Sequence, residues 1–205
     1  GWSTGERVMA RGSACHAEHV VLDVRALMPA PDNLSDAEAA TIPNVFVTAH
    51  DALFSAARMQ PGERILVSAA SSGVGTAAIQ LARAAGATVF ATTRAAIKTQ
   101  RLRALGADFV VDTTRANWGQ EILDNGGPVH CVIDQVGGGL FEGLVRVMDI
   151  LGRYVSVGRN GGPDAALDLD LLARQRLSLI GVTFRTRSNE ESWACSERFA
   201  RDWLN

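Results

Sequence analysis

The sequence predicts an α/β fold in which six parallel strands form a doubly wound sheet, preceded by a shorter β-rich segment. Two observations predict it. From residue 64 onward, short apolar runs alternate with helical segments that mostly end at glycine, which is typical of βαβ units. The first run, residues 65–67, is wholly apolar, as expected of a strand buried on both faces of a parallel sheet. At 205 residues, the chain can form one large domain, or one domain and part of another.

The first 45 residues form the β-rich segment. Short strands are expected at 7–10 and 19–22, and the sequence Met-Pro-Ala-Pro at 28–31 predicts a rigid connection. Residues 35–38, Ser-Asp-Ala-Glu, match a capping box and predict the start of a short helix.

The doubly wound part follows as a regular series. Its six predicted strands cover residues 65–67, 88–92, 109–111, 131–133, 154–157 and 177–182. Helices are predicted over residues 48–58, 74–85, 96–105, 118–123, 141–148 and 169–173, and an amphipathic helix over 190–204.

Composition excludes several classes of partner. The net charge of −2 gives no reason to expect nucleic acid or an anionic membrane. No apolar run approaches the roughly 18 residues of a membrane span, and no signal peptide is visible. Cys15, Cys131 and Cys195 are too widely spaced for a disulfide framework, which favours reduced thiols in a cytoplasmic protein. Because residue 1 is glycine and a strand follows almost directly, we expect the chain to begin inside a domain.

The turn after the first strand of the series is the main functional motif. A dinucleotide site requires small residues there, so that the backbone and the helix N-terminus can approach a pyrophosphate. Aligned on Gly75, the pattern G-x-G-x-x-G has Ala70 and Ser72 in its first two glycine positions, with Gly73 as an extra glycine. The hydroxyls of Ser71 and Ser72 could donate hydrogen bonds to phosphate. Its place after the first strand predicts a dinucleotide-binding Rossmann domain; the alternative is a small-residue turn without a ligand.

The end of the second strand bears on the choice of dinucleotide. NAD-selective sites place an acidic residue there, to hold the ribose hydroxyls. This strand instead ends with Thr93 and Arg94, and Lys98 follows one helical turn later. A guanidinium, an ammonium and a hydroxyl suit a 2′-phosphate, so we expect NADPH as cofactor. The alternative is that both cations are ordinary solvated residues.

Short segments along the whole chain carry a resemblance to one known family. They are residues 5–8, 38–43, 48–53, 60–63, 73–75, 78–82, 104–108, 134–138, 152–155 and 179–182. In this collinear order they resemble the medium-chain dehydrogenase/reductases, and within them the zinc-free, quinone-oxidoreductase-like branch.

The resemblance implies a Rossmann domain over 46–185, inserted into a GroES-like catalytic domain. Residues 1–45 would be part of that catalytic domain and 186–205 a helix leading back to it, with the remainder outside this chain. The cofactor-binding residues that the resemblance implies are Thr48 beside the nicotinamide carboxamide, Gly73, Val74 and Gly75 at the pyrophosphate, Lys98 at the 2′-phosphate, and Val157, Gly158 and Phe184 along the nicotinamide. Thr113, after Asp112, departs from the tyrosine of many relatives and puts the adenosine contact in doubt.

Other reactive side chains favour structural roles. Cys15, His16 and His19 lie within five residues of one another at a strand edge, a poor tetrahedral ligand set, so we expect no metal site. His50 could lie near the nicotinamide, but a packing role is favoured. Asp134, at the end of a buried strand, is expected to be a hydrogen-bond acceptor rather than a general acid. No catalytic residue is predicted.

The resemblance implies hydride transfer from NADPH to a quinone or another conjugated acceptor, without a metal. An enoyl reductase acting on acyl thioesters, free-standing or within a polyketide synthase, is the alternative enzyme. A non-catalytic NADPH-binding protein is the third possibility. The apolar edge strand at 177–182 needs a cover, and we expect a homodimer through it.

Overall fold

The computed structural model describes residues 1–204, and the chain divides into two compact units. The first unit consists of Gly1–Asp51 together with the segment from Thr183 onward, and the second is Ala52–Val182. None of the described helices combines the length and the apolar character that a membrane crossing requires.

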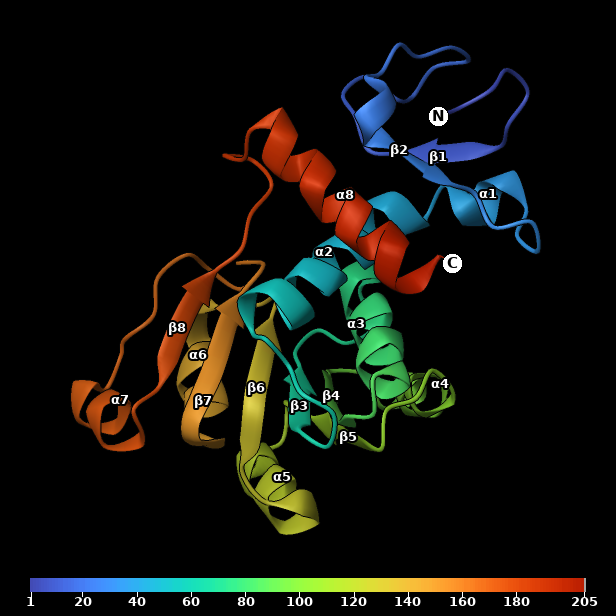
Figure 1. Cartoon of the computed structure of the whole chain (residues 1–205). Coiled ribbons are helices and arrows are strands. Elements are labelled where there is room, and N and C mark those ends of the chain that lie inside the picture. The colour runs from blue at the N-terminus through green and yellow to red at the C-terminus, as the bar shows by residue number, and fades with distance from the viewer. Residues whose placement is uncertain (205) are drawn as a thin grey trace. The chain divides into compact units, whose positions relative to one another are not determined.

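The second unit is built on a six-stranded parallel sheet with the order β5-β4-β3-β6-β7-β8 (Figure 1). The strands are β3 (Arg64–Val67), β4 (Thr88–Thr93), β5 (Phe109–Asp112), β6 (Val129–Asp134), β7 (Met148–Ser156) and β8 (Ser178–Gly181). The connecting helices are α3 (Gly73–Ala84), α4 (Thr99–Ala104), α5 (Trp118–Gly126), α6 (Phe141–Arg146) and α7 (Leu169–Gln175), with short 3-10 turns η3 (Ala96–Lys98) and η4 (Gly138–Leu140). The predicted doubly wound sheet is therefore confirmed.

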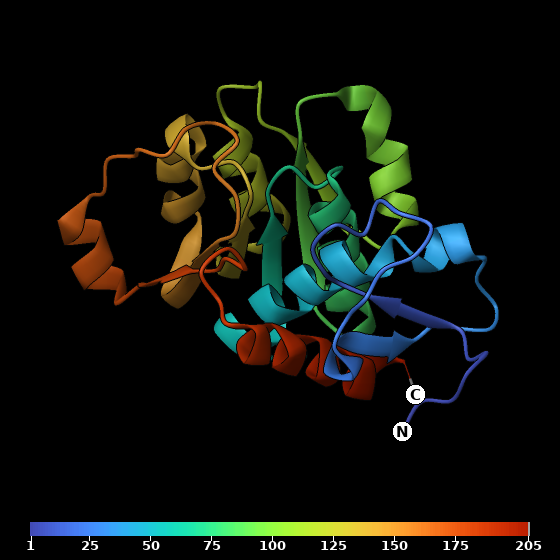
Figure 2. The same cartoon turned by 90° about the horizontal axis from the view of Figure 1, so that it is seen from above.

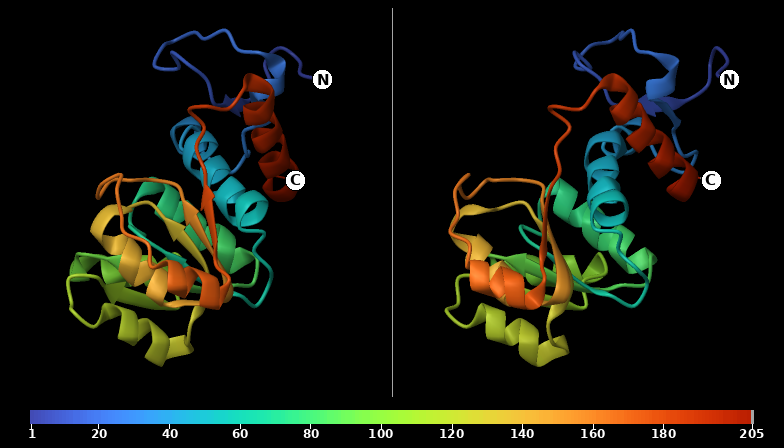
Figure 3. Two further views of the ribbon diagram at one scale, coloured as in Figure 1. Left: turned by 90° about the vertical axis from the view of Figure 1, so that its left-hand side faces the viewer. Right: turned by 60° about the vertical axis from the view of Figure 1, so that its left-hand side comes forward.

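The apolar strands are buried because helices lie on both faces of the sheet (Figure 2, Figure 3). On one face, Leu66 of β3 and Phe90 of β4 join a core that includes Ile122 of α5 and Leu144 of α6. Phe90 stacks on Phe109 with 4.7 Å between ring centroids. Alternate strand residues face the other side and are buried as well, as the fully buried Ile65 and Ile133 illustrate. This packing fixes the carboxyl ends of the strands, where the candidate site lies.

The first unit combines a two-stranded sheet with three helices. β1 (Val8–Ala10) pairs antiparallel with β2 (Leu27–Pro29), and the 3-10 turn η1 (Val24–Ala26) leads into β2. The helices are α1 (Asp36–Ala39), α2 (Ile42–His50) and α8 (Asn189–Trp203). Ser35 and Glu38 form the predicted capping box at α1. α8 packs on α2, where the Phe199 ring lies 6.3 Å from Phe46 and 5.8 Å from His50.

Two predictions for this region are wrong. Residues 19–22 form no strand, because Asp23 caps η1 by accepting a hydrogen bond from the Arg25 amide at 2.9 Å, and the chain becomes extended only after that turn. The rigid connection was expected at 28–31, but its first two residues belong to a strand, because residues 27–29 form β2. The helix expected over 48–58 begins at Ile42, with proline in its first turn, and continues after His50 as the π-helix η2 (Asp51–Ala56).

Candidate functional site

The candidate site of the second unit lies at the carboxyl ends of β3 and β6. These strands are neighbours in the sheet, but the chain runs from β3 to β4 on one side and from β6 to β7 on the other. In open α/β sheets, such a reversal of strand order creates a crevice that binds ligands. Two turns meet here: the phosphate turn, residues 68–75, after β3, and residues 135–138 after β6.

The phosphate turn is closely packed against the start of α3. Ser72 caps the helix, because its Oγ accepts a hydrogen bond from the Gly75 amide at 3.0 Å. A Cβ on Gly75 would lie 2.7 Å from the carbonyl oxygens of both Ala69 and Ala70, so only glycine fits. Gly73 is exposed and Val74 half-buried. The N-terminus of α3 therefore presents backbone N–H groups beside a surface without bulky side chains.

Asp134 anchors the turn after β6. Its carboxylate is fully buried and accepts hydrogen bonds from the hydroxyls of Ser68 and Tyr154, and from the amides of Val136 at 2.9 Å and Gly137 at 2.8 Å. Burial, and then the bond to Asp134, raise the pKa of Tyr154 far above its usual range, so this hydroxyl stays protonated and donates. Asp134 thus serves as a hydrogen-bond acceptor, the role that its position at a strand end favours.

Gln135 connects the two turns, and the sequence motifs did not single it out. Its side-chain oxygen accepts a hydrogen bond from the Ser72 hydroxyl at 2.5 Å. Its side-chain nitrogen donates to the Ser68 carbonyl at 3.0 Å, and its backbone amide donates to the Ser68 hydroxyl at 2.8 Å. The signal that could have identified it is positional: it is the first residue after the strand that borders the switch point.

Val157 and Gly158 belong to a third turn at the same edge. The Asp134 carbonyl accepts hydrogen bonds from the amides of Val157 at 2.7 Å and Gly158 at 3.1 Å. A Cβ on Gly158 would lie 2.7 Å from the Gln135 carbonyl oxygen, so this turn is pressed against Gln135. The structure therefore brings Val157 and Gly158 to the same edge as the phosphate turn.

The predicted cationic residues lie beside the phosphate turn. Lys98, in η3, donates from Nζ to the Ser71 hydroxyl at 3.3 Å. Thr93 ends β4, the strand next to β3, and its hydroxyl accepts from the Ala95 amide at 3.2 Å. Arg94 follows and is exposed. Ser71, Lys98 and the end of β4 consequently lie at one edge of the sheet.

Thr48 and Phe184 belong to the first unit. The Thr48 hydroxyl donates to the Asn44 carbonyl at 2.7 Å within α2, which leaves its oxygen as an acceptor. The Phe184 ring is flanked by two guanidinium groups, with Arg11 at 3.8 Å and Arg187 at 4.7 Å from the ring centroid. An acceptor hydroxyl and an aromatic ring are both compatible with the contacts that the resemblance implies for these residues.

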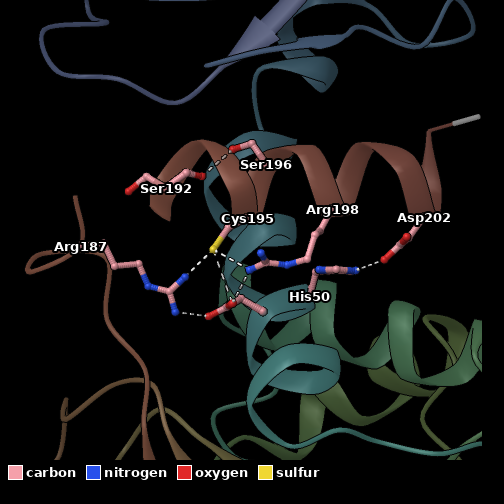
Figure 4. A network of polar contacts seen from close by, with 8 residues as sticks. His50, Arg187, Ser192, Cys195, Ser196, Arg198 and Asp202 are labelled. Carbon is pink, nitrogen blue, oxygen red and sulfur yellow. Dashed lines mark hydrogen bonds and ion pairs between the residues drawn. The ribbon is translucent and has the colours of Figure 1, made fainter. Parts of the chain in front are cut away.

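A partly buried charged cluster joins the end of α2 to the segment before α8 and to α8 itself (Figure 4). Asp51 accepts a hydrogen bond from Arg187 at 2.6 Å, and its other oxygen lies 3.6 Å from Arg198. Cys195 donates to Asp51 at 3.5 Å and contacts both guanidinium groups. Burial, followed by the Asp51 charge, raises the pKa of the Cys195 thiol, so the sulfur carries its proton. We call Asp51, Arg187, Cys195 and Arg198 the α2–α8 clamp.

Metal-binding side chains do not gather in the part of the chain that the structure describes. Across residues 1–204, no three His, Cys, Asp or Glu side chains are arranged so that they could hold an ion. Cys15 is exposed, and its thiol donates to the Ser13 carbonyl at 3.6 Å.

Comparison with known proteins identifies relatives of this chain. The family described as zinc-binding dehydrogenase matches residues 73–200. A phenolphthiocerol/phthiocerol polyketide synthase from Mycobacterium tuberculosis is 33% identical over 177 residues, which cover 85% of this chain and 8% of that protein.

Solved structures give the same kind of match. The quinone oxidoreductase from Thermus thermophilus, solved alone and in complex with NADPH, is 32% identical with a TM-score of 0.75; the match covers 87% of this chain and 56% of that one. The CurK enoyl reductase is 29% identical with a TM-score of 0.75, and the match covers 89% of this chain and 56% of that one. The chain thus spans little more than half of these solved chains and a small part of the curated relative.

Proposed function

Because the chain belongs to the zinc-binding dehydrogenase family, and so to the medium-chain dehydrogenase/reductases, we propose that it is an NADPH-dependent oxidoreductase that transfers a hydride to a conjugated, electron-poor acceptor without a metal. One observation carries the proposal: a turn of small residues leads into the capped N-terminus of α3 at the switch point of the sheet. The similarity of the chain to a quinone oxidoreductase solved with NADPH supports it.

The residues at the switch point fit a dinucleotide. The close approach of Gly75 to the turn leaves no room for a side chain, as a pyrophosphate cradle requires. The helix N-terminus favours negative charge, and the Lys98 ammonium lies beside the turn. The N–H groups of Gly73 and Val74 and the Ser71 hydroxyl would hold the pyrophosphate.

The phosphorylated form of the cofactor is favoured by the charges at the end of β4. Thr93 and Arg94 stand where NAD-selective relatives of this fold place an acid. Asp112, at the end of the neighbouring strand, accepts hydrogen bonds from the Thr114 amide at 3.0 Å and the Thr114 hydroxyl at 2.8 Å. With that carboxylate engaged, Arg94 and Lys98 would meet the 2′-phosphate.

The bound cofactor would supply the hydride from C4 of its nicotinamide, and the protein would orient it. Val157, Gly158 and Phe184 would line the nicotinamide, and the Thr48 oxygen would accept from its carboxamide. Without a metal to polarise the acceptor, the plausible acceptors are already activated, such as quinones, enones and enoyl thioesters.

Two acceptor classes have comparable support. The polyketide synthase relative and the enoyl reductase structure favour an enoyl thioester, whereas the Thermus enzyme favours a quinone. Oxidation of NADPH, followed by its absorbance with a quinone, a simple enone and a crotonyl thioester, separates them. Turnover of one class alone assigns the substrate. Binding of NADPH without turnover of any of the three, by protein that includes the remainder of the catalytic domain, would identify a non-catalytic binding protein and refute the enzymatic proposal.

We also propose roles for the two units. The first unit would be part of a GroES-like catalytic domain, and the second the Rossmann domain. The edge strand β8 carries Leu179 with 42% of its surface exposed, and pairing with a second copy would cover it. We therefore propose a homodimer through β8.

A further inference from the structure

Gln135 is a buried polar residue that the proposed function leaves without a role. Its residue surface is 5% exposed, and it stands between the phosphate turn and the turn after β7. We propose that Gln135 is a positioning residue, which holds the phosphate turn in the conformation that binds the pyrophosphate. This inference rests on the proposed function, because it concerns the same cofactor.

Both ends of the Gln135 amide are used on the phosphate turn. The oxygen accepts from the Ser72 hydroxyl at 2.5 Å, and the nitrogen donates to the Ser68 carbonyl at 3.0 Å. Ser68 begins the turn, and Ser72 is the residue in it that caps α3. One planar side chain therefore fixes the distance between the first residue of the turn and the cap of α3.

The Ser72 hydroxyl is committed by these contacts. It donates to Gln135 and accepts from the Gly75 amide, so its one proton is already engaged and is not available to a pyrophosphate. This changes the roles expected of the two serines in the turn. Ser71 would donate a hydrogen bond to phosphate, whereas the Ser72 hydroxyl would link Gln135 to the start of α3.

The phosphate turn needs such a restraint. Ala69 has a φ of 44°, in the left-handed region that residues with a Cβ adopt at a cost. Two positions that are glycine in the usual pattern are Ala70 and Ser72. A backbone that is strained and lacks these glycines holds its shape only when neighbouring groups determine it.

Gln135 also contacts the turn that would line the nicotinamide. The Gln135 carbonyl oxygen lies where a Cβ on Gly158 would approach to 2.7 Å. The same residue thus touches the segments proposed for the pyrophosphate and for the nicotinamide of the cofactor. A shift of its backbone would move both, but truncation of its side chain acts on the phosphate turn alone.

The test compares two ligands, of which only one would contact the phosphate turn. Gln135→Ala should bind NADPH about tenfold more weakly, as expected if the turn without its restraint adopts the binding conformation about one time in ten. Adenosine 2′-monophosphate, which has no pyrophosphate, should bind equally well to both proteins. For turnover, KM for NADPH should rise by a similar factor while kcat stays within about twofold. Gln80→Ala is the matched control, because Gln80 lies on α3, the helix that follows the phosphate turn, and its amide donates to the Thr76 carbonyl within that helix at 3.0 Å.

A double-mutant cycle shows whether Gln135 acts through Ser72. Ser72→Ala combined with Gln135→Ala should bind NADPH no more weakly than the weaker single variant. Additive losses, or equal loss of both ligands in Gln135→Ala, would overturn the inference. If Gln135→Ala does not fold, Gln135→Leu enters the same cycle, since it fills a similar volume but lacks the amide that contacts Ser68 and Ser72. Wild-type protein that fails to bind NADPH would instead refute the proposed function itself.

Discussion

Single charged side chains should determine which nicotinamide cofactor binds. Arg94 is exposed at the end of β4, and Lys98 reaches the phosphate turn. If both contact a 2′-phosphate, replacing both with alanine should weaken NADPH binding about 30-fold and leave NADH binding within about twofold. Titration of intrinsic fluorescence with each dinucleotide measures the two affinities.

The control for this pair is a cation of the same unit with another partner. Arg174→Ala removes a guanidinium that pairs with Asp170 within α7 at 3.0 Å, and should change neither affinity. Equal losses for NADPH and NADH in the Arg94→Ala, Lys98→Ala double variant would show that the two cations do not recognise the 2′-phosphate.

His50 should make the stability of the first unit depend on pH. Its side chain is 2% exposed, and burial lowers its pKa; the hydrogen bond to Asp202 at 3.1 Å and the charge of Asp51 oppose that shift, while Arg198 adds to it. Because burial prevails, the folded protein binds fewer protons here than the unfolded chain at mildly acidic pH. The stability from neutral His50 is thus present above the unfolded pKa of about 6.5 and decreases as pH falls below it.

The measurement is the melting temperature between neutral and mildly acidic pH. His50→Phe keeps an aromatic ring beside Phe199 without a titrating group, and its melting temperature should fall less across this range than that of the wild type. His16→Phe removes an exposed imidazole and should leave the wild-type slope unchanged. A His50→Phe curve parallel to the wild type would show that other groups cause the pH dependence.

At the scale of residues, the sequence showed where site residues lie in the chain more readily than it showed which residues contact each other. The placement of Gly75 after an apolar strand predicted the turn, because both features are local in the chain. Gln135 and Ser72 are 63 positions apart, and their contact exists only because β3 and β6 become neighbours in the sheet. Single-residue patterns carry no signal for such a pair.

At the scale of elements, the α2–α8 clamp should contribute to the stability of the first unit. Asp51 has 3% of its side chain exposed and Arg187 22%, and Arg187→Ala would leave a buried carboxylate without its shortest ion pair. The expected loss is about 2 kcal/mol, less than for a fully buried pair because Arg187 is partly solvated. Urea unfolding followed by tryptophan fluorescence measures it, since Trp193 lies on α8.

One further variant separates charge from packing at the clamp, and another serves as a surface control. Arg187→Lys retains the charge and should recover part of the loss. Arg146→Ala removes a surface pair with Glu142 on α6 and should cost no more than about 0.5 kcal/mol. If Arg187→Ala were as stable as Arg146→Ala, the clamp would have no measurable effect on stability.

Elements of the second unit could be predicted because each strand contains a short, mostly apolar run between turn residues. In the first unit, the signals conflict. Val20 and Val21 favour a strand by composition, yet Val21 is 98% exposed, since the cap at Asp23 sets where the chain becomes extended. Apolar residues do recur at helical spacing over 48–58, but this spacing does not distinguish an α-helix from the π-helix η2 that follows His50.

At the scale of the whole molecule, the first unit is assembled from two segments that are distant in sequence. The chain leaves the first unit after Asp51 and returns to it at Thr183. The sequence predicted a similar division, with a domain inserted into another, only through resemblance to a family. Composition and periodicity do not indicate such an insertion, because α8 belongs with residues more than a hundred positions earlier.

The outer strand β8 should determine whether the protein forms a dimer. β8 is an outer strand, with one side paired to β7, and its Leu179 is 42% exposed. If two copies pair through β8, Leu179→Lys places two ammonium groups near the shared edge, and their repulsion and desolvation should convert the dimer to a monomer at micromolar concentration. Sedimentation velocity measures the mass. Leu169→Lys, at a leucine of α7 that is 69% exposed, should leave the dimer intact. A wild-type protein that sediments as a monomer would contradict the proposed pairing, because the apolar edge would then be tolerated in solution without a partner copy.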